Sequence, residues 1–98
     1  PFFLFAFTEN THFPAIPPNK KYQIYPQDDF GINGYLNNLN YFDKKLQEFF
    51  EAAKKTDWFD NTIFIITGDH TIGKGFVNSN LKRFSHFKIP LIIYAPKI

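Results

Sequence analysis

The fold is decided by a short apolar stretch in the second half of the chain, TIFIITGDH at residues 62–70. Residues 62–67 carry no charge, are rich in β-branched side chains and are too few for a typical helix. This pattern is typical of a strand buried on both faces of a parallel sheet. The sequence therefore predicts a buried strand at 62–67, followed at once by a loop that carries Gly68, Asp69 and His70.

Further elements lie on either side of this stretch. Apolar runs at residues 2–8 and 90–95 predict two more strands. Between the first run and residue 62, apolar residues recur at spacings of three and four, which predicts an amphipathic helix that Asn33 could cap. The residues on its apolar face are Tyr35, Leu36, Leu39, Phe42, Leu46, Phe49, Phe50 and Ala53.

Strand, long helix and strand in this order form a βαβ unit, whose strands lie parallel. The fold class is therefore α/β, part of a mostly parallel sheet with a crossover helix. With 98 residues, 44% hydrophobic and including 14 Phe, the chain allows one densely buried domain at most. Because it begins abruptly in an apolar run, we expect an internal piece of a larger fold.

Composition limits the partners and the chemistry. The net charge of +2 arises from eleven basic and nine acidic residues scattered along the chain, so we expect no nucleic-acid partner. Without cysteine, metal ligands are limited to carboxylate, imidazole and hydroxyl groups. No apolar run approaches the roughly 20 residues that span a bilayer, so we expect any membrane anchor to lie elsewhere.

Candidate site residues follow two of the predicted strands. His12 lies shortly after residues 2–8, and Asp69 and His70 follow residues 62–67. Because the carboxyl ends of parallel strands share one edge of a sheet, we expect these three side chains to converge. Gly68 would let the backbone bend so that carboxylate and imidazole turn towards one ion. Such mixed oxygen and nitrogen ligands suit Zn²⁺ or Mn²⁺, a Lewis acid for a phosphoryl or sulfuryl oxygen.

Plainer roles stay open for each of these residues. Asp69 and His70 could be turn or cap residues of an α/β piece without a ligand. His12 could be an ordinary loop histidine, and His86 could be a surface residue among basic neighbours.

Four blocks of the chain resemble the alkaline-phosphatase/sulfatase superfamily. Residues 57–70 are similar to its "(Y/F)DNT" turn, core strand and Asp-His metal pair, and residues 1–14 resemble its strand and "H-x-P" loop. Residues 35–43 are similar to its "Y-x-x-x-(I/L)-x-Y-x-D" helix start, and residues 89–94 to its "(V/I)-P-L-I-I" strand. The resemblance is strongest to lipoteichoic-acid-synthase-like phosphoglycerol transferases and membrane-anchored sulfatase-like proteins.

The resemblance implies a role for each candidate residue. Asp69 and His70 would bind Mn²⁺ or Zn²⁺, with Mg²⁺ or Ca²⁺ as alternatives. His12 would be a catalytic residue that holds the phosphoryl or sulfuryl group or its leaving oxygen, and His86 is reminiscent of a substrate-side histidine. The substrate would be a phosphate or sulfate ester, with a membrane-lipid head group as one candidate, at the extracytoplasmic face of a bacterial membrane, periplasmic or on the cell surface.

The family's hydroxyl or modified-cysteine nucleophile and a further acidic metal ligand belong to a region upstream of these blocks. Residues 1–98 are therefore expected to be a partial catalytic domain, inactive alone and prone to self-association. One departure is Thr71, where many relatives have glycine. The parent would transfer phosphoglycerol or phosphoethanolamine, or hydrolyse an ester as sulfatases do. The alternative is a non-catalytic binding or scaffold module of the same fold at the cell surface.

Overall fold

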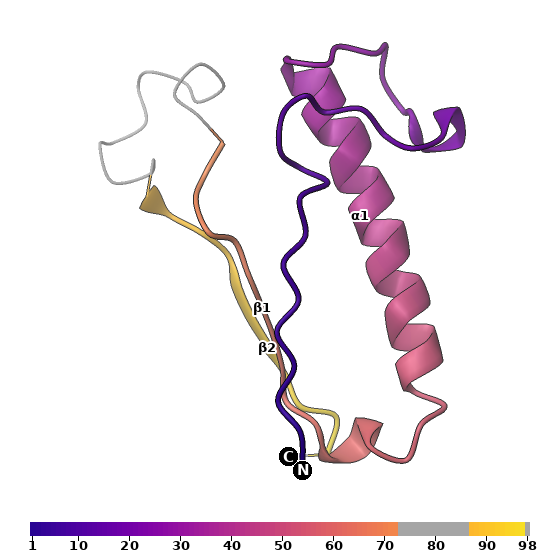
Figure 1. The fold of residues 1–98 in the computed structure, drawn as a ribbon, viewed down its shortest axis with the longest axis vertical. Coiled ribbons are helices and arrows are strands. Elements are labelled where there is room, and N and C mark those ends of the chain that lie inside the picture. Colours follow the sequence, from indigo (N-terminus) through magenta and orange to yellow (C-terminus); the bar gives the residue numbers. More distant parts are fainter. Residues whose placement is uncertain (73–86, 98) are drawn as a thin grey trace. The chain divides into compact units, whose positions relative to one another are not determined.

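The computed structural model describes residues 1–72 and 87–97 of the chain. Its elements are, in chain order, η1 (Lys20–Tyr22), α1 (Ile32–Ala53), η2 (Phe59–Asn61), β1 (Phe64–Thr67) and β2 (Leu91–Tyr94). Figure 1 labels α1, β1 and β2. The chain divides into two compact units, Pro1–Glu51 and Ala52–Ile98, and each forms its own set of contacts.

The long helix α1 confirms the helix predicted from the periodic apolar residues. It begins at Ile32, so Asn33 lies inside its first turn and does not cap it, contrary to the prediction. The apolar stripe is only partly covered, since Leu39 is 40% and Phe49 is 45% exposed. Among the described helices, none is both long enough and apolar enough to cross a membrane.

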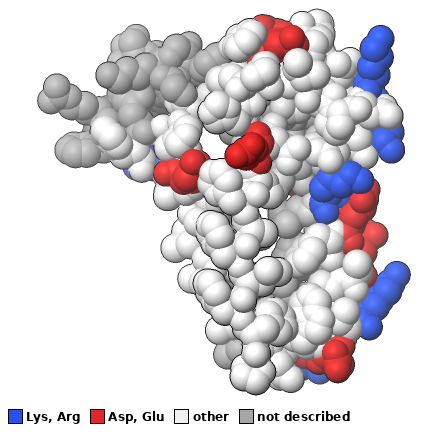
Figure 2. All heavy atoms as spheres, in the orientation of Figure 1, with Lys and Arg blue, Asp and Glu red and all other residues white. Residues whose placement is uncertain are grey.

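Charges of both signs lie on the surface of α1. Lys45 Nζ donates to Glu48 Oε2 at 2.7 Å, one helical turn away. Figure 2 shows acidic and basic side chains mingled along the right-hand edge of the view rather than gathered by sign. The helix surface therefore presents no strong field of one sign on this face.

The loop before α1 packs tightly against the first turn of the helix. Ala15 is fully buried, donates from its backbone N–H to Asp29 O at 2.6 Å, and accepts from Gln27 Nε2 at 3.0 Å. The loop backbone approaches Gly34 so closely that a Cβ there would lie 2.0 Å from Asp28 O and 2.9 Å from Ala15 O. Only glycine fits at this crossing.

Two asparagines of α1 fasten the loop that precedes the helix. The fully buried Asn37 accepts from the backbone N–H groups of Ile24 and Tyr25 at 2.8 and 3.0 Å and donates to Tyr25 O at 3.0 Å. One helical turn on, Asn40 Nδ2 donates to Tyr22 O at 2.9 Å. The core of the first unit is thus partly polar, and both ends of the Asn37 amide are paired there, as burial requires.

In the second unit, β1 and β2 pair antiparallel, with Phe64 opposite Tyr94 and Thr67 opposite Leu91. Both elements confirm the apolar runs predicted as strands. β1 begins two residues later than predicted because Thr62 closes the 3₁₀ turn η2: its N–H donates to Phe59 O at 3.2 Å and its hydroxyl to Trp58 O at 2.6 Å.

Aromatic side chains cover one side of this strand pair. The ring of Phe59, only 6% exposed, lies 5.5 Å from that of Phe64 and 6.2 Å from that of Tyr94, and the rings of Phe64 and Tyr94 stack at 6.0 Å. Lys97 Nζ forms an ion pair with Asp60 of η2. These contacts hold the segment after α1 against the strands.

Helix and strands support the α/β class, but two details of the predicted sheet are wrong in this chain. Residues 2–8 form no strand, and Phe3 is 93% exposed, because an apolar run becomes a strand only when neighbouring backbone pairs with it. Nor is β1 buried on both faces, since Ile65 is 64% exposed. The described pair of β1 and β2 is antiparallel, and the mostly parallel sheet stays a prediction. A two-stranded ribbon has one side covered and the other open.

Candidate functional site

The pair Asp69 and His70 lies directly beyond the end of β1. Asp69 Oδ1 accepts from the backbone N–H of His70 at 2.9 Å, and Asp69 Oδ2 lies 3.6 Å from His70 Nε2. On its other side the ring places Nδ1 at 2.8 Å from Thr71 O. Because a carbonyl oxygen only accepts, Nδ1 carries the hydrogen, and Nε2 of the neutral ring keeps its lone pair. One carboxylate oxygen and one ring nitrogen are therefore left for a ligand.

Their separation fits a shared cation. Two ligands at about 2.1 Å from a tetrahedral metal lie about 3.4 Å from one another, close to the 3.6 Å between Asp69 Oδ2 and His70 Nε2. Oxygen and nitrogen together suit Zn²⁺ or Mn²⁺. Both side chains are exposed and accessible, His70 by 73% and Asp69 by 61%. Within residues 1–72 and 87–97, no third histidine or acidic side chain joins them.

Thr67, which the sequence did not single out, ties this corner together. Its hydroxyl lies 2.9 Å from Pro90 O and 3.2 Å from Gly68 O, so it links the end of β1 to the residue before β2. A threonine at the last position of a strand, next to glycine, is the signal that could have indicated this tether.

The backbone freedom predicted for Gly68 is not used. No glycine among the described residues has a positive φ, and a Cβ on Gly68 would meet its nearest neighbour, His70 O, at 3.6 Å, an ordinary contact. The loop therefore turns Asp69 and His70 towards one point with backbone angles that any residue adopts.

His12 lies in a turn of the first unit. Its N–H donates to Glu9 O at 2.9 Å, and its Nδ1 lies 2.7 Å from Phe13 O, ahead of the cis bond between Phe13 and Pro14. The same reasoning as for His70 places the hydrogen on Nδ1 and leaves Nε2 of this exposed ring for a ligand. The ring is thus held by its own loop.

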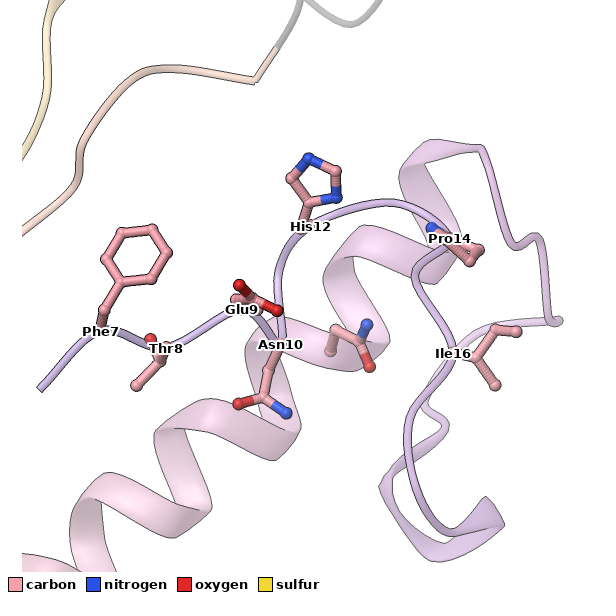
Figure 3. Close-up of a pocket in the computed structure, with 8 residues that line it drawn as sticks. Phe7, Thr8, Glu9, Asn10, His12, Pro14 and Ile16 are labelled. Carbon is pink, nitrogen blue, oxygen red and sulfur yellow. The ribbon is translucent and has the colours of Figure 1, made fainter.

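An open pocket of about 510 Å³ lies beside His12. Figure 3 shows the imidazole of His12 and the amide of Asn10 pointing to opposite sides of the loop. The lining is mostly polar, and it consists of Phe7, Thr8, Glu9, Asn10, His12, Pro14 and Ile16 from the loop and Asn38 from α1. The first unit therefore places its candidate histidine at the rim of a hollow that could hold a small polar ligand.

The structure places Asp69 Oδ2 and His70 Nε2 3.6 Å apart, and the role of the two residues as metal ligands stays a prediction. His12 belongs to the first unit and the Asp69–His70 pair to the second, so their convergence stays a prediction. His86 lies outside the described residues, and its substrate-side role also stays a prediction.

The model of the sulfatase family matches residues 1–98, the whole of the chain. This chain belongs to the sulfatase family. Sulfatase-family membership implies an α/β fold and an enzyme family of hydrolases and transferases. It confirms the superfamily resemblance found in the sequence.

Curated relatives point to one branch of the sulfatase family. Lipoteichoic acid synthases of Staphylococcus aureus strains USA300 and NCTC 8325 are each 31% identical to the chain over 72 residues, which is 71% of this chain and 11% of theirs. The chain thus spans about a tenth of the length of these relatives. No solved structure matches it significantly.

Proposed function

We propose that residues 1–98 are part of the catalytic domain of a metal-dependent enzyme that acts on a phosphate or sulfate ester. Transfer of a phosphoglycerol or phosphoethanolamine group is the first candidate, in line with relatives named lipoteichoic acid synthase, and hydrolysis differs from it only in the acceptor. The observation that carries the proposal is the 3.6 Å separation between Asp69 Oδ2 and His70 Nε2, each free to bind one cation.

Asp69 and His70 would hold the ion through these two atoms. A divalent cation bound there, Mn²⁺ or Zn²⁺ first and Mg²⁺ or Ca²⁺ as alternatives, would supply a Lewis acid for an ester oxygen. The bonds from Asp69 Oδ1 to the His70 N–H and from His70 Nδ1 to Thr71 O fix both side chains before an ion arrives. Such supporting hydrogen bonds orient metal ligands in proteins.

His12 would act on the ester through Nε2. Its Nδ1–H bond to Phe13 O holds the ring, so Nε2 is the only ring atom left for the substrate. In its imidazolium form, which carries a second proton on Nε2, His12 would donate that proton to a phosphoryl or sulfuryl oxygen, or to the leaving oxygen. We place the hydroxyl or modified-cysteine nucleophile and the remaining acidic ligand in another part of the parent protein. We place the active site on the extracytoplasmic side of a bacterial membrane, where a lipid head group is a candidate substrate.

The decisive measurement is the Mn²⁺ and Zn²⁺ affinity of the complete domain that carries this chain. We expect Asp69→Ala and His70→Ala each to weaken binding by at least about tenfold. Asp43→Asn on the surface of α1 removes a carboxylate elsewhere and should leave the affinity unchanged. Equal affinity in all four proteins would exclude the site.

The role of His12 needs a separate readout. His12→Ala in the complete enzyme should lower turnover of a phosphodiester by about a hundredfold, the usual worth of a general acid, while the metal content stays the same. Unchanged turnover would remove His12 from the active site.

A second candidate is a non-catalytic binding or scaffold module of the same fold. It is favoured by one observation: in the part of the chain that the structure describes, only two potential ligands gather, and both are exposed. The complete gene decides between the two candidates. A hydroxyl or cysteine nucleophile with a further acid upstream supports the enzyme, and loss of both supports the module.

A further inference from the structure

The loop before α1 carries a tip, residues 20–25, that combines two lysines with exposed apolar side chains. Ile24 is 62% and Tyr25 is 45% exposed. Lys20 and Lys21 precede them in the 3₁₀ turn η1, and both lysines are exposed. In Figure 1 the tip stands out to one side of the N-terminal half of α1. The first unit therefore presents apolar and basic side chains together, away from its own core.

The backbone of the tip is fastened to α1 although its side chains are exposed. Asn37 Oδ1 accepts from the N–H groups of Ile24 and Tyr25 at 2.8 and 3.0 Å. Asn40 Nδ2 donates to Tyr22 O at 2.9 Å. Side chains on a fixed backbone lose little conformational freedom when a partner arrives. The tip is thus preorganised for contact.

Residues 21–26 leave no backbone N–H without a partner. Besides the two N–H groups that Asn37 binds, those of residues 21–23 donate to Asn19 and Lys20. Pro26, which follows the tip, has no N–H. An unpaired N–H is costly in an apolar medium, so a segment that enters a lipid interface must satisfy its donors internally. The tip meets this condition.

The charge of the tip is positive and uncompensated. No aspartate or glutamate occurs from residue 10 to residue 27. Among the residues that the structure describes, neither Lys20 nor Lys21 has an acidic partner within ion-pair distance. Lys21 Nζ lies 4.9 Å from the centre of the Tyr22 ring instead. Two ammonium groups are therefore available to an anionic partner.

The nearest acidic residues along the chain belong to the base of the loop. Asp29 O accepts from the N–H of the buried Ala15, and the Asp29 carboxylate accepts from Gln27 Nε2, each at 2.6 Å. Asp28 O lies against Gly34 in the first turn of α1. These contacts fix both aspartates where the loop meets the helix, so the basic end of the loop is its tip.

We propose that residues 20–25 dock the protein on an anionic lipid bilayer, with Ile24 and Tyr25 in the interface and the two lysines on lipid phosphates. Isoleucine suits the apolar side of such an interface, and tyrosine suits the boundary because one end of its ring is polar. Lysines close to an anionic membrane are attracted by its negative surface potential. A stable protein interface takes about 20–30 residues a side, far more than this tip supplies, which favours lipid over a protein partner.

The proposal rests on the proposed function only in placing the protein at the outer face of a bacterial membrane. His12 lies earlier in the same loop. Docking of the tip would therefore hold this candidate ester-binding histidine close to the plane of the lipid head groups. The tip would orient the domain, and it needs neither the metal nor the ester to do so.

The test places a nitroxide spin label on the tip of the complete protein through Ile24→Cys, in a background without other cysteines. Nanodiscs that contain phosphatidylglycerol should raise the accessibility of the label to oxygen and lower its accessibility to a water-soluble nickel complex. Nanodiscs of phosphatidylcholine alone should change neither. A matched label at Asp43→Cys, on the exposed surface of α1, should not differ between the two kinds of disc.

Charge reversal tests the lysines. In Lys20→Glu/Lys21→Glu, the ratio of docked to free tip on phosphatidylglycerol discs should fall by about thirtyfold, the worth of two lysines near an anionic surface. Both side chains are exposed, so the melting temperature should stay the same. Equal docking of this variant would overturn the proposal. So would a tip label that stays in water with both discs, or one that neither reagent reaches because another part of the protein covers it.

Failure of the proposed function gives a different result. Asp69→Ala removes a proposed metal ligand only, so its tip label should respond to phosphatidylglycerol as in the unsubstituted protein. Lys20→Glu/Lys21→Glu should in turn keep the wild-type rate on a soluble phosphodiester. A protein that binds no metal but still docks would refute the ester site and support the tip, whereas loss of docking in Asp69→Ala would overturn the tip as an independent surface.

Discussion

Asn37 and Tyr25 pair through two hydrogen bonds, as two strands of a sheet would: Tyr25 N–H donates to Asn37 Oδ1 and Asn37 Nδ2 donates to Tyr25 O, each at 3.0 Å. Ile24 N–H adds a second donor to the same oxygen. One side chain of α1 thus replaces a backbone partner for the loop that leads into the helix. The loop would otherwise leave these backbone groups unpaired at a partly buried position.

Loss of this pairing should destabilise the first unit. Asn37→Leu leaves two N–H groups and one carbonyl without partners, and we expect it to lower the free energy of unfolding by about 2–4 kcal/mol. Asn40→Ala removes a single bond, to Tyr22 O, and should cost about 1 kcal/mol. Urea unfolding of the complete domain measures both, and equal losses would contradict the special role of Asn37.

Substitution by alanine should change the free energy of unfolding differently at Gly34 and at Gly68. Gly34→Ala places a methyl group 2.0 Å from Asp28 O, so the loop must move, and we expect a loss of about 1–3 kcal/mol despite the better helix propensity of alanine. Gly68→Ala meets only ordinary contacts and should be close to neutral. Thermal unfolding distinguishes them, and tolerance of Gly34→Ala would show that the loop does not cross the helix there.

Thr67 should act as a positioning residue for the proposed metal site at Asp69 and His70. Thr67→Val keeps the shape but removes the hydroxyl that reaches Pro90 O and Gly68 O, so the Asp69–His70 corner should loosen. We expect Mn²⁺ affinity in the complete domain to fall by about tenfold, no more than on loss of one of the ligands themselves. Thr67→Ser restores the hydroxyl and should recover most of the affinity. Equal affinities for the valine and serine variants would contradict this role.

The stability that Lys45 adds to α1 should depend on pH in the alkaline range. Its hydrogen bond to Glu48 is the main cause that raises the pKa of Lys45 above its usual 10.5, with Tyr22 adding to it. Because the pKa is higher in the folded state, the stabilisation is complete below 10.5 and is lost as the pH rises through the raised value. Lys45→Met should therefore lower the urea midpoint at pH values well below 10.5, and this difference should disappear once the pH has risen through the raised pKa of Lys45. A difference in urea midpoint between the wild-type protein and Lys45→Met that does not change with pH would exclude this stabilisation.

The sequence predicted local elements well and pairing poorly. The spacing from Tyr35 to Ala53 indicated α1, and the apolar runs at 62–67 and 90–95 indicated β1 and β2, because these signals are local. Residues 2–8 carry the same kind of signal but form no strand. The direction of a strand and its neighbours depend on distant residues, so neither the antiparallel pairing nor the absence of a first strand could be derived from periodicity.

In the candidate site, too, the sequence indicated the residues with a local pattern and missed those whose contacts are distant in sequence. Asp69 and His70 were predicted as a pair because they follow an apolar strand, and the structure brings their free atoms together. Thr67 and Asn38 were missed, because a threonine at a strand end and an asparagine inside a helix carry no pattern of their own. The significance of Thr67 comes from a partner distant in sequence, Pro90, and that of Asn38 from its burial beside the loop of His12.

The pairing of Thr67 with Leu91 has an evolutionary consequence. The chain leaves the sheet at one of these residues and returns at the other, so both ends of the intervening sequence are anchored side by side. Doubling the length of such an excursion adds only about 0.6 kcal/mol to the entropy lost on closing it. Insertions between the two strands therefore cost little in folding free energy as long as Thr67 and Leu91 stay paired.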